Sequence, residues 1–310
     1  MLKYIFKRFI YMIITIWIII TATFIMMHSI PGDPFSSGKR LPEQTRINLN
    51  MKYGLDKPLK TQYGLFLKNL VIHGDLGQSY TYPGLTVNSI IKERAPASAM
   101  LGIEALIFSL IIGITIGIIA AFKRNHWQDY LVMIIAILGI AIPSFVLAAL
   151  FQYFFAVKLE VLPTSGWGSF KNTILPALSL SLGIIAVYAR YMRSSCIDVL
   201  GQDYIMTAEA KGISKVTLVW KHVIRNAILP AITILGQQVA GIITGTFVIE
   251  TIFSIPGIGR YFVSSITDRD YPVILGTTIF VAIIYVVVVF IVDILYSLVD
   301  PRIRISNGKK

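Results

Sequence analysis

The chain has 310 residues, of which 55% are hydrophobic and only 14% charged, and its net charge is +12. Soluble domains carry about 25% charged residues, so this composition excludes an ordinary soluble fold and predicts an all-α membrane protein. Nucleic-acid binding is disfavoured, because Lys and Arg gather at the ends of apolar runs and do not alternate with aromatic residues. The single cysteine, Cys196, excludes an internal disulfide, and the scattered histidines indicate no metal site built by this chain.

A membrane-spanning helix needs about 20 apolar residues. Lys3, Lys7 and Arg8 precede the first apolar run, as they would in a signal peptide. That run is too long for a signal peptide, however, and it leads into Pro31-Gly32-Asp33-Pro34, which is no cleavage site, so we expect an uncleaved helix. The six predicted spans are residues 9–30, 97–122, 130–157, 174–189, 230–254 and 273–298.

The distribution of Lys and Arg predicts that both termini are cytoplasmic. Basic residues outnumber acidic ones in the segments that this orientation places inside, above all in 190–225. The long outer segment has helix-like stretches near 43–53 and 58–72, so we expect it to be folded. The predicted domains are 1–30 (tail and first span), 31–96 (outer loop), 97–298 (five-helix core with the inner loop 190–229) and 299–310 (cytoplasmic tail).

The inner loop contains the signals of two short helices. Asp203 is a good N-cap for a helix that contains the small residues Ala208 and Ala210, and Gly212 suits the left-handed residue that ends it. Ser214 can cap a second helix over 215–226, before Pro230 opens the next span. The segment is either an amphipathic surface loop or a docking element. Its basic residues, which suit lipid headgroups or an acidic partner, are Lys211, Lys215, Lys221 and Arg225.

Glu104 lies inside a predicted span, where a carboxylate costs about 2.5–3.5 kcal/mol unless it faces protein or water. It either lines a substrate path or makes an interhelical hydrogen bond. The small-residue pairs Gly113/Gly117 and Gly241/Gly245 indicate close helix packing. Residues 256–260 form a Gly-rich outer turn, but they lack the Lys-Ser/Thr of a nucleotide-binding loop.

The stretch 201–230 resembles the coupling loop of ABC importer permeases, in the longer form found in oligopeptide, dipeptide and nickel importers. Where the short general form has Glu-Ala-Ala, this chain has Met206-Thr207-Ala208, and more residues separate Gly212 from Pro230; both departures are typical of the peptide branch. The resemblance covers essentially the whole chain and points to the B-type subunit. Further matching stretches are 30–34, 53–56, 74–79, 162–168, 250–260, 269–272, 293–296 and 300–304.

The resemblance implies a type I ABC importer permease fold in a bacterial inner membrane, forming half of a pathway for peptides. It implies as partners a second permease, two cytoplasmic ATPases that use ATP, and an extracytoplasmic substrate-binding protein; this chain itself would bind no cofactor and hold no catalytic residue. The coupling residues would be Asp203, Tyr204, Ala208, Glu209, Ala210, Gly212, His222, Arg225 and Asn226. Possible path residues are Glu104, Glu250, Pro256, Gly257, Gly259 and Arg260.

Two alternatives stay open at this point. Permeases for nickel or another small solute are closely similar to those for peptides. A stand-alone secondary transporter would need more ionisable residues inside the membrane than Glu104 and Asp293, and usually internal repeats. A membrane-embedded hydrolase is disfavoured, because the spans contain neither a nucleophile–base pair nor an HExxH motif.

Overall fold

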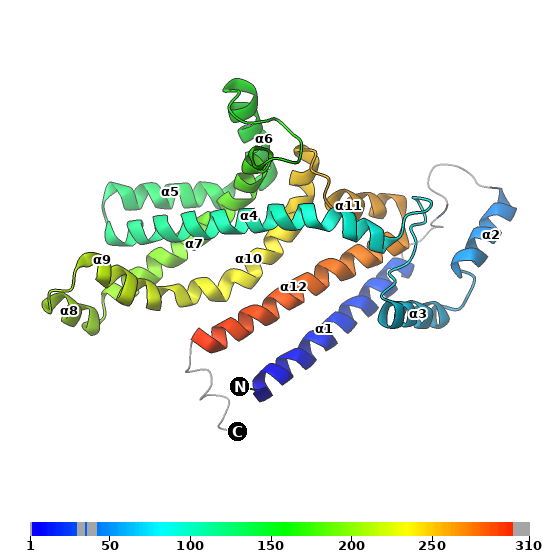
Figure 1. The fold of residues 1–310 in the computed structure, drawn as a ribbon, viewed down its shortest axis with the longest axis horizontal. Coiled ribbons are helices and arrows are strands. Elements are labelled where there is room, and N and C mark those ends of the chain that lie inside the picture. The colour runs from blue at the N-terminus through cyan, green and yellow to red at the C-terminus, as the bar shows by residue number, and fades with distance from the viewer. Residues whose placement is uncertain (1, 30–34, 36–41, 300–310) are drawn as a thin grey trace. The chain divides into compact units, whose positions relative to one another are not determined.

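The computed structural model describes residues 2–29, 35 and 42–299, and within these ranges the chain is helical and has no strand (Figure 1). Five of the described helices are long and apolar enough to cross a membrane, and a bent pair makes a sixth, so the predicted all-α membrane fold is confirmed. The motifs at 30–34 and 300–304, and the tail after Val299, lie outside the described residues. The helices are α1 (Leu2–Ser29), α2 (Glu43–Tyr53), α3 (Leu59–Lys68), η1 (Asn69–His73, a π-helix), α4 (Val87–Phe122), α5 (Trp127–Ala141), α6 (Ser144–Phe151), η2 (Gln152–Lys158, π), α7 (Phe170–Leu200), α8 (Asp203–Ala210), α9 (Lys215–Thr217), η3 (Leu218–Ile224, π), α10 (Arg225–Ile252), α11 (Gly259–Asp268) and α12 (Tyr271–Val299).

The chain forms two compact units. In the described part, the first unit comprises residues 2–5, 99–255 and 287–299, and the second comprises 6–98 and 256–286. Helix α4 therefore begins in the second unit and continues through the first. These two units do not test the four predicted domains, which follow the predicted membrane topology, so the domain division stays a prediction.

Helix α7 is the most enclosed span of the first unit, with 67% of its apolar stretch buried, against at most 33% for the other continuous spans. Its neighbour α4 approaches it closely because two glycines lie at the contact. A Cβ at Gly113 would lie 2.8 Å from the Cβ of Tyr188, and a Cβ at Gly117 would lie 2.6 Å from the backbone oxygen of Ala189. The predicted packing role of Gly113 and Gly117 is therefore confirmed.

Gly241, the first glycine of the second predicted pair, behaves differently. A Cβ at Gly241 would meet no described atom within 4 Å, so this glycine does not lie at a close helix contact in the described part of the chain. Close packing at Gly241 therefore has no counterpart among the described atoms and stays a prediction. A small-residue pattern signals that a close approach is possible, but it does not identify the chain that makes the approach.

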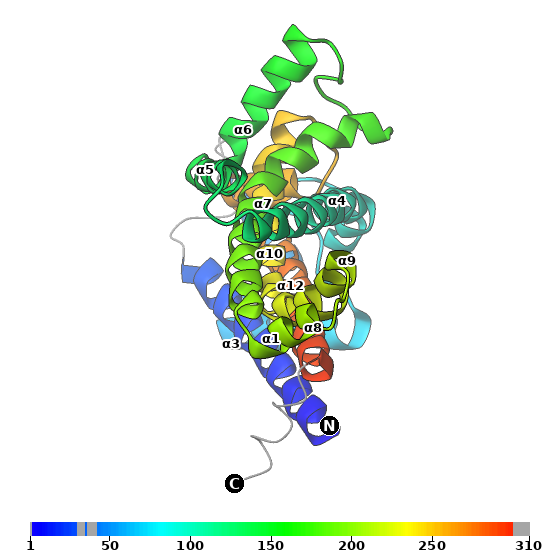
Figure 2. The same ribbon diagram turned by 90° about the vertical axis from the view of Figure 1, so that its left-hand side faces the viewer.

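The third predicted span, 130–157, is not one straight helix. Helices α5 and α6 meet at an angle of 106°, and Figure 2 shows α6 turning away from α5. The break falls at Ile142 and Pro143, where Ile142 has extended backbone (φ −91°, ψ 121°). A residue before proline is pushed out of the helical region, which explains the break.

The fourth and fifth spans were predicted too narrowly. Helix α7 extends past the predicted 174–189 to Leu200 and includes Arg190 and Arg193. The predicted loop helix 215–226 does not end near Asn226; the chain runs on through η3 into α10, with Pro230 inside that helix. Neighbouring helices and local π-helical adjustments allow proline inside membrane helices, so Pro230 does not mark a boundary.

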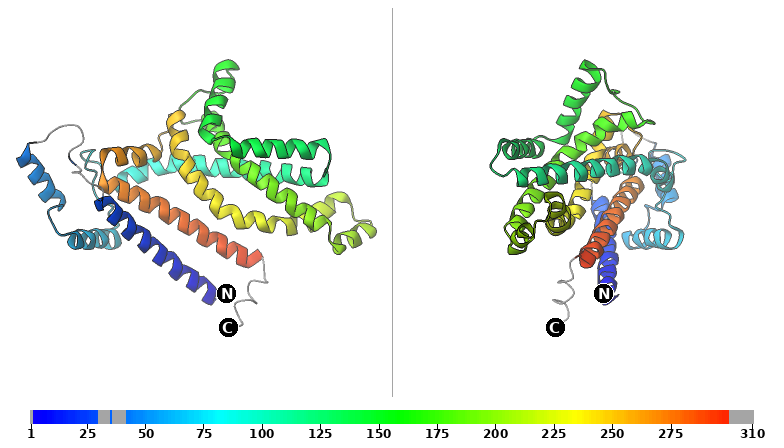
Figure 3. Two further views of the ribbon diagram at one scale, coloured as in Figure 1. Left: turned by 180° about the vertical axis from the view of Figure 1, so that it is seen from behind. Right: turned by 60° about the vertical axis from the view of Figure 1, so that its left-hand side comes forward.

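In the second unit, α1 and α12 pack side by side through Phe24, Met27, Tyr271 and Ile274 (Figure 3). Helices α2 and α3 with η1 occupy the stretches that the sequence predicted as helical in the outer segment, so this expectation is confirmed. Proline precedes both α2 and α3, which suits helix starts because an N–H group at this position would have no intrahelical partner and proline lacks one.

The loop after η1 is fastened to the start of α12 by a buried carboxylate. Asp270 is fully buried and accepts hydrogen bonds from the Ser79 hydroxyl and from the backbone N–H groups of Tyr80 and Thr81, the latter two at 3.1 Å. Burial and, next, the negative charge of Asp270 raise the pKa of the Tyr80 phenol above its ordinary value. The hydrogen bonds to Asp270 thus join segments about 190 residues apart in the sequence.

The glycine contact between α4 and α7 can be tested by adding one methyl group. Gly117→Ala should destabilise the protein by about 1–3 kcal/mol, because the new Cβ overpacks against the backbone of α7. Gly64→Ala on α3 is the matched control, since nothing lies within 4 Å of its Cβ position. Thermal unfolding of the purified variants in detergent measures both. Equal melting temperatures would contradict the close contact.

Candidate functional site

The segment 203–226, which we call the hairpin element, contains α8, α9, η3 and the first residues of α10. Helix α8 ends in a tight cap, in which Gly212 has left-handed backbone (φ 73°). The Gly212 N–H donates to the Glu209 carbonyl (2.9 Å) and the Ile213 N–H donates to the Ala208 carbonyl (3.3 Å). This pair of bonds is the Schellman motif, so the predicted conformation of Gly212 is confirmed.

The second turn of the hairpin element begins as the sequence suggests, but the first does not. The Ser214 hydroxyl accepts the N–H of Thr217 (3.3 Å), which confirms Ser214 as a cap. Asp203, predicted as the cap of α8, is instead the first helical residue, and the residue before α8, Gln202, makes no side-chain cap bond. Asp203 still places a carboxylate in the first turn, where the helix dipole favours it.

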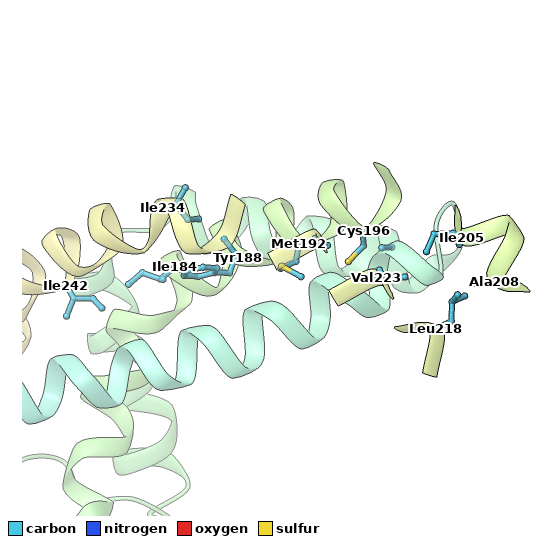
Figure 4. Close-up of a cluster of buried hydrophobic side chains, with 13 residues drawn as sticks. Ile184, Tyr188, Met192, Cys196, Ile205, Ala208, Leu218, Val223, Ile234 and Ile242 are labelled. Carbon is cyan, nitrogen blue, oxygen red and sulfur yellow. The ribbon is translucent and has the colours of Figure 1, made fainter. Parts of the chain in front are cut away.

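One face of the hairpin element packs into the first unit. Ile205 and Ala208 of α8 are buried with Leu218 and Val223 of η3. Figure 4 shows these side chains continuing a row that runs along α7 and α10. The row on α7 consists of Ile184, Tyr188, Met192 and Cys196. Ala208 is therefore a packing residue of this chain, and its small size serves the contact between α8 and η3.

The opposite face of the hairpin element is exposed. Among the predicted coupling residues, Asp203, Tyr204, Glu209, Ala210, Gly212, Arg225 and Asn226 are exposed and His222 is half-buried. The Asn226 amide donates to the Tyr204 hydroxyl (3.1 Å) and to the backbone oxygen of His222 (2.8 Å). These two bonds link α8 to η3 on the exposed side.

The exposed face also has an apolar component that sequence reasoning missed. Met206, Val216 and Trp220 are 60%, 69% and 68% exposed. Exposed apolar groups among polar ones are typical of an interaction surface. Their spacing in the sequence does not reveal this, because the non-helical connection between α8 and α9 sets their direction.

The predicted path residues are divided between the units. Glu104 and Glu250 belong to the first unit, and Pro256, Gly257, Gly259 and Arg260 belong to the second. Glu250 is buried, whereas Glu104 is half-buried and its Oε2 finds no hydrogen-bond partner among the described residues. The expected interhelical hydrogen bond of that oxygen is therefore absent there. In the second unit, the Ile258 N–H donates to the Ser98 hydroxyl (2.9 Å), which fastens the Gly-rich turn to α4.

Sequence reasoning also missed a buried ion pair in the first unit. Asp129, at the start of α5, accepts two hydrogen bonds from the Arg193 guanidinium of α7, at 2.5 and 2.7 Å. A third comes from the Asn125 N–H (3.1 Å), and the Asp129 side chain is only 3% exposed. The partners lie 64 residues apart, so only the packing of α5 on α7 reveals the pair.

Comparison with known proteins identifies the architecture. Residues 113–305 match the family described as binding-protein-dependent transport system inner membrane component, and residues 1–102 match the N-terminal region of such membrane components. The chain belongs to this family. It is therefore a multi-pass inner-membrane permease component with the type I ABC permease fold, as the resemblance had implied.

The relatives of this permease match it over nearly their whole length. The dipeptide transport system permease DppB of Bacillus subtilis is 46% identical over 307 residues, covering 99% of both chains. The oligopeptide transport system permease OppB of Salmonella typhimurium is 44% identical, covering 98% of this chain and all of its own. DppB of Lactococcus lactis is 43% identical with the same coverage. The predicted resemblance to the B-type subunit is confirmed.

The ion pair of this permease component predicts an asymmetric effect of mutation. Arg193→Ala should cost about 3 kcal/mol of stability, because it leaves the Asp129 carboxylate buried without its cation. Arg193→Lys should cost less, since it keeps the charge and loses the two-pronged geometry. The control is Arg190→Ala, which removes an exposed arginine from the same helix. Thermal unfolding in detergent ranks the variants, and equal losses for Arg190→Ala and Arg193→Ala would refute the role of the pair.

Proposed function

We propose that this chain forms half of the translocation pathway of a peptide importer. Its partners are a similar second permease, two cytoplasmic ATPases that consume ATP, and an extracytoplasmic substrate-binding protein. Both termini lie in the cytoplasm, which places the hairpin element on the ATPase side. The relatives named for dipeptide and oligopeptide transport support the substrate class. The observation that carries the coupling role is the two-faced hairpin element, with one exposed face and one face packed along α7.

The coupling mechanism follows from this arrangement. The ATPase contacts the exposed face, where Tyr204, Met206 and Trp220 offer apolar contact area and Glu209 offers charge. The buried face fills the space between α8, η3 and α7, and close-packed side chains transmit displacement because they cannot be compressed. A contact that differs between ATPase states can therefore shift α7 and α10 between inward-open and outward-open arrangements.

The ion pair adds α5 to the helices that move with the hairpin element. Arg193 lies on α7 between the membrane span and the hairpin element, and its partner Asp129 lies in the first turn of α5. Displacement of the hairpin element would therefore carry α5 together with α7. The bend after α5 then allows α6 to change direction independently, because no continuous helix joins the two.

Glu104 is the residue that we propose to meet the substrate. Its Oε2 is buried and finds no partner among the described residues, although a carboxylate inside a membrane segment needs one. The ammonium group of a peptide would supply a charge-assisted hydrogen bond. The carboxylate therefore favours peptides over anionic solutes, and specificity for sequence would rest with the external binding protein.

Gly212→Pro tests the coupling assignment. Proline requires φ near −65°, whereas Gly212 has φ 73°, and the substitution also removes the N–H that caps α8. We expect normal insertion, loss of dipeptide uptake into membrane vesicles, and ATPase activity that no longer responds to the loaded binding protein. Gly201→Ala is the control, because that glycine has φ −80° and its Cβ would lie 3.7 Å from the nearest atom. Normal uptake by Gly212→Pro would contradict the coupling role of the hairpin element.

Glu104→Gln tests the path assignment separately. Loss of one charge-assisted bond, about 1.5–3 kcal/mol, should raise the KM for dipeptide uptake about tenfold or more and leave substrate-free ATPase activity unchanged. Glu93→Gln, at an exposed glutamate of the same helix, should change neither quantity. Unchanged KM in Glu104→Gln would remove this residue from the path, and uptake of nickel without dipeptide uptake would reassign the substrate.

A further inference from the structure

The second unit contains a cavity of about 350 Å³ that no coupling or path residue lines. Its walls come from α1, α2, α3 and α12 and from the loops that follow α2 and η1. Aromatic rings make up about half of the apolar part of the lining. The charged lining residues in the described part of the chain are Lys52 and Lys57, both positive. A ligand with an apolar body and an anionic group would complement this lining. The aromatic lining residues are Phe24, Tyr53, Phe66, Tyr80 and Tyr271.

The cavity lies beside the end of the first apolar span, because α3 runs beside the last turns of α1. The Tyr63 hydroxyl lies 2.6 Å from the Thr21 hydroxyl, and the rings of Phe24 and Phe66 stack with centroids 6.0 Å apart. Thr21 precedes Ser29, the end of the α1 span, by about two turns, or roughly 12 Å of helix. A bilayer that α1 crosses from end to end would bring α3 to the headgroup level of the leaflet in which α1 ends.

The exposed surface of α3 and η1 suits this depth. Leu65, Val71 and Ile72 are 42%, 79% and 64% exposed, and the lysines Lys60 and Lys68 are exposed as well. Exposed apolar residues mixed with lysine are typical of a helix that lies in the membrane interface. The lysine stems can lie along acyl chains while their ammonium groups reach the phosphates.

The loop that carries Lys57 is held in place by hydrogen bonds. The Gln62 amide donates to the backbone oxygens of Leu55 (3.2 Å) and Lys57 (2.8 Å), which leaves its Oε1 to face His28 Nε2 at 3.1 Å. The turn before it is set by Gly54, which has left-handed backbone (φ 69°). Lys57 thus lies on an ordered loop tied to α1, so the wall of the cavity that it forms has a fixed conformation.

We propose that this cavity binds one anionic phospholipid from the leaflet in which α1 ends, the outer leaflet in the proposed orientation. The phosphate lies between Lys52 and Lys57, and the acyl chains lie along the exposed apolar side of α3 and η1. An acidic side chain of an external protein could also meet two lysines. The depth of α3 and the exposure of Val71 and Ile72 favour the lipid.

Native mass spectrometry of the complete transporter tests the proposal. After delipidation, we expect one phosphatidylglycerol to rebind, with affinity reduced about tenfold or more in Lys52→Ala/Lys57→Ala, because two charge-assisted contacts are lost. Lys60→Ala is the matched control, an exposed lysine of α3 that does not line the cavity, and should bind normally. Equal binding by both variants, or equal binding of phosphatidylcholine, would overturn the proposal. The proposal would also be overturned if no lipid rebinds and the external binding protein binds through the two lysines instead.

Spin labelling tests the depth of α3 and η1 in the membrane with variants that keep both Lys52 and Lys57. A label at Ile72→Cys should be more accessible to oxygen than to a water-soluble nickel complex, whereas a label at Gln44→Cys, on the polar start of α2, should show the reverse. The native Cys196 is buried and should not compete for the label. Preferential accessibility to the nickel complex at position 72 would place η1, and α3 that leads into it, in water and refute the lipid site.

Discussion

The close approach of α4 to α7 at Gly113 and Gly117 is the contact on which the first unit depends. Lipid offers no hydrophobic drive between helices, so association in a membrane rests on van der Waals contact and on interhelical polar bonds. Glycine allows the two backbones to come together, and Ser181 strengthens the same contact by donating to the Ala105 carbonyl at 3.0 Å. With α4 held on one side, α5 and α10 pack on the remaining surface of α7. The enclosed α7 then continues directly toward the hairpin element.

The hairpin element joins this packed core to the exposed surface through ordinary helix chemistry. The left-handed Gly212 ends α8, Ser214 starts the next turn, and the Asn226 amide ties that turn back to Tyr204. These local bonds fix the angle between α8 and η3. The buried row in Figure 4 then connects the fixed pair to α7. The two sets of contacts together make the element a rigid attachment of the membrane helices, which a mobile surface loop would not be.

Hydropathy was sufficient to predict the presence of the spans, because exposed backbone polar groups are not tolerated in lipid and helices satisfy them internally. Two of the three local caps were also predictable, because Gly212 and Ser214 act through neighbours within five residues, whereas Asp203 is the first helical residue and no cap. The misplaced boundaries had non-local causes. Helix α7 continues past its apolar stretch, and Arg193 in that extension is paired with Asp129 on another helix. Pro143 broke a helix and Pro230 did not, and the hydropathy of the flanking residues does not distinguish the two cases.

The carboxylates that lie away from water separate structural roles from functional ones. Asp129 accepts three hydrogen bonds and Asp270 at least as many, and both link segments distant in the sequence. Carboxylates satisfied in this way contribute to a single native arrangement. Glu104 differs, because its buried Oε2 has no partner within the described chain although desolvation without a bond costs free energy. A permanent cost of this kind is tolerated where a ligand or a partner subunit completes the bond. The unsatisfied oxygen is therefore the observation on which the proposed contact between Glu104 and the substrate rests.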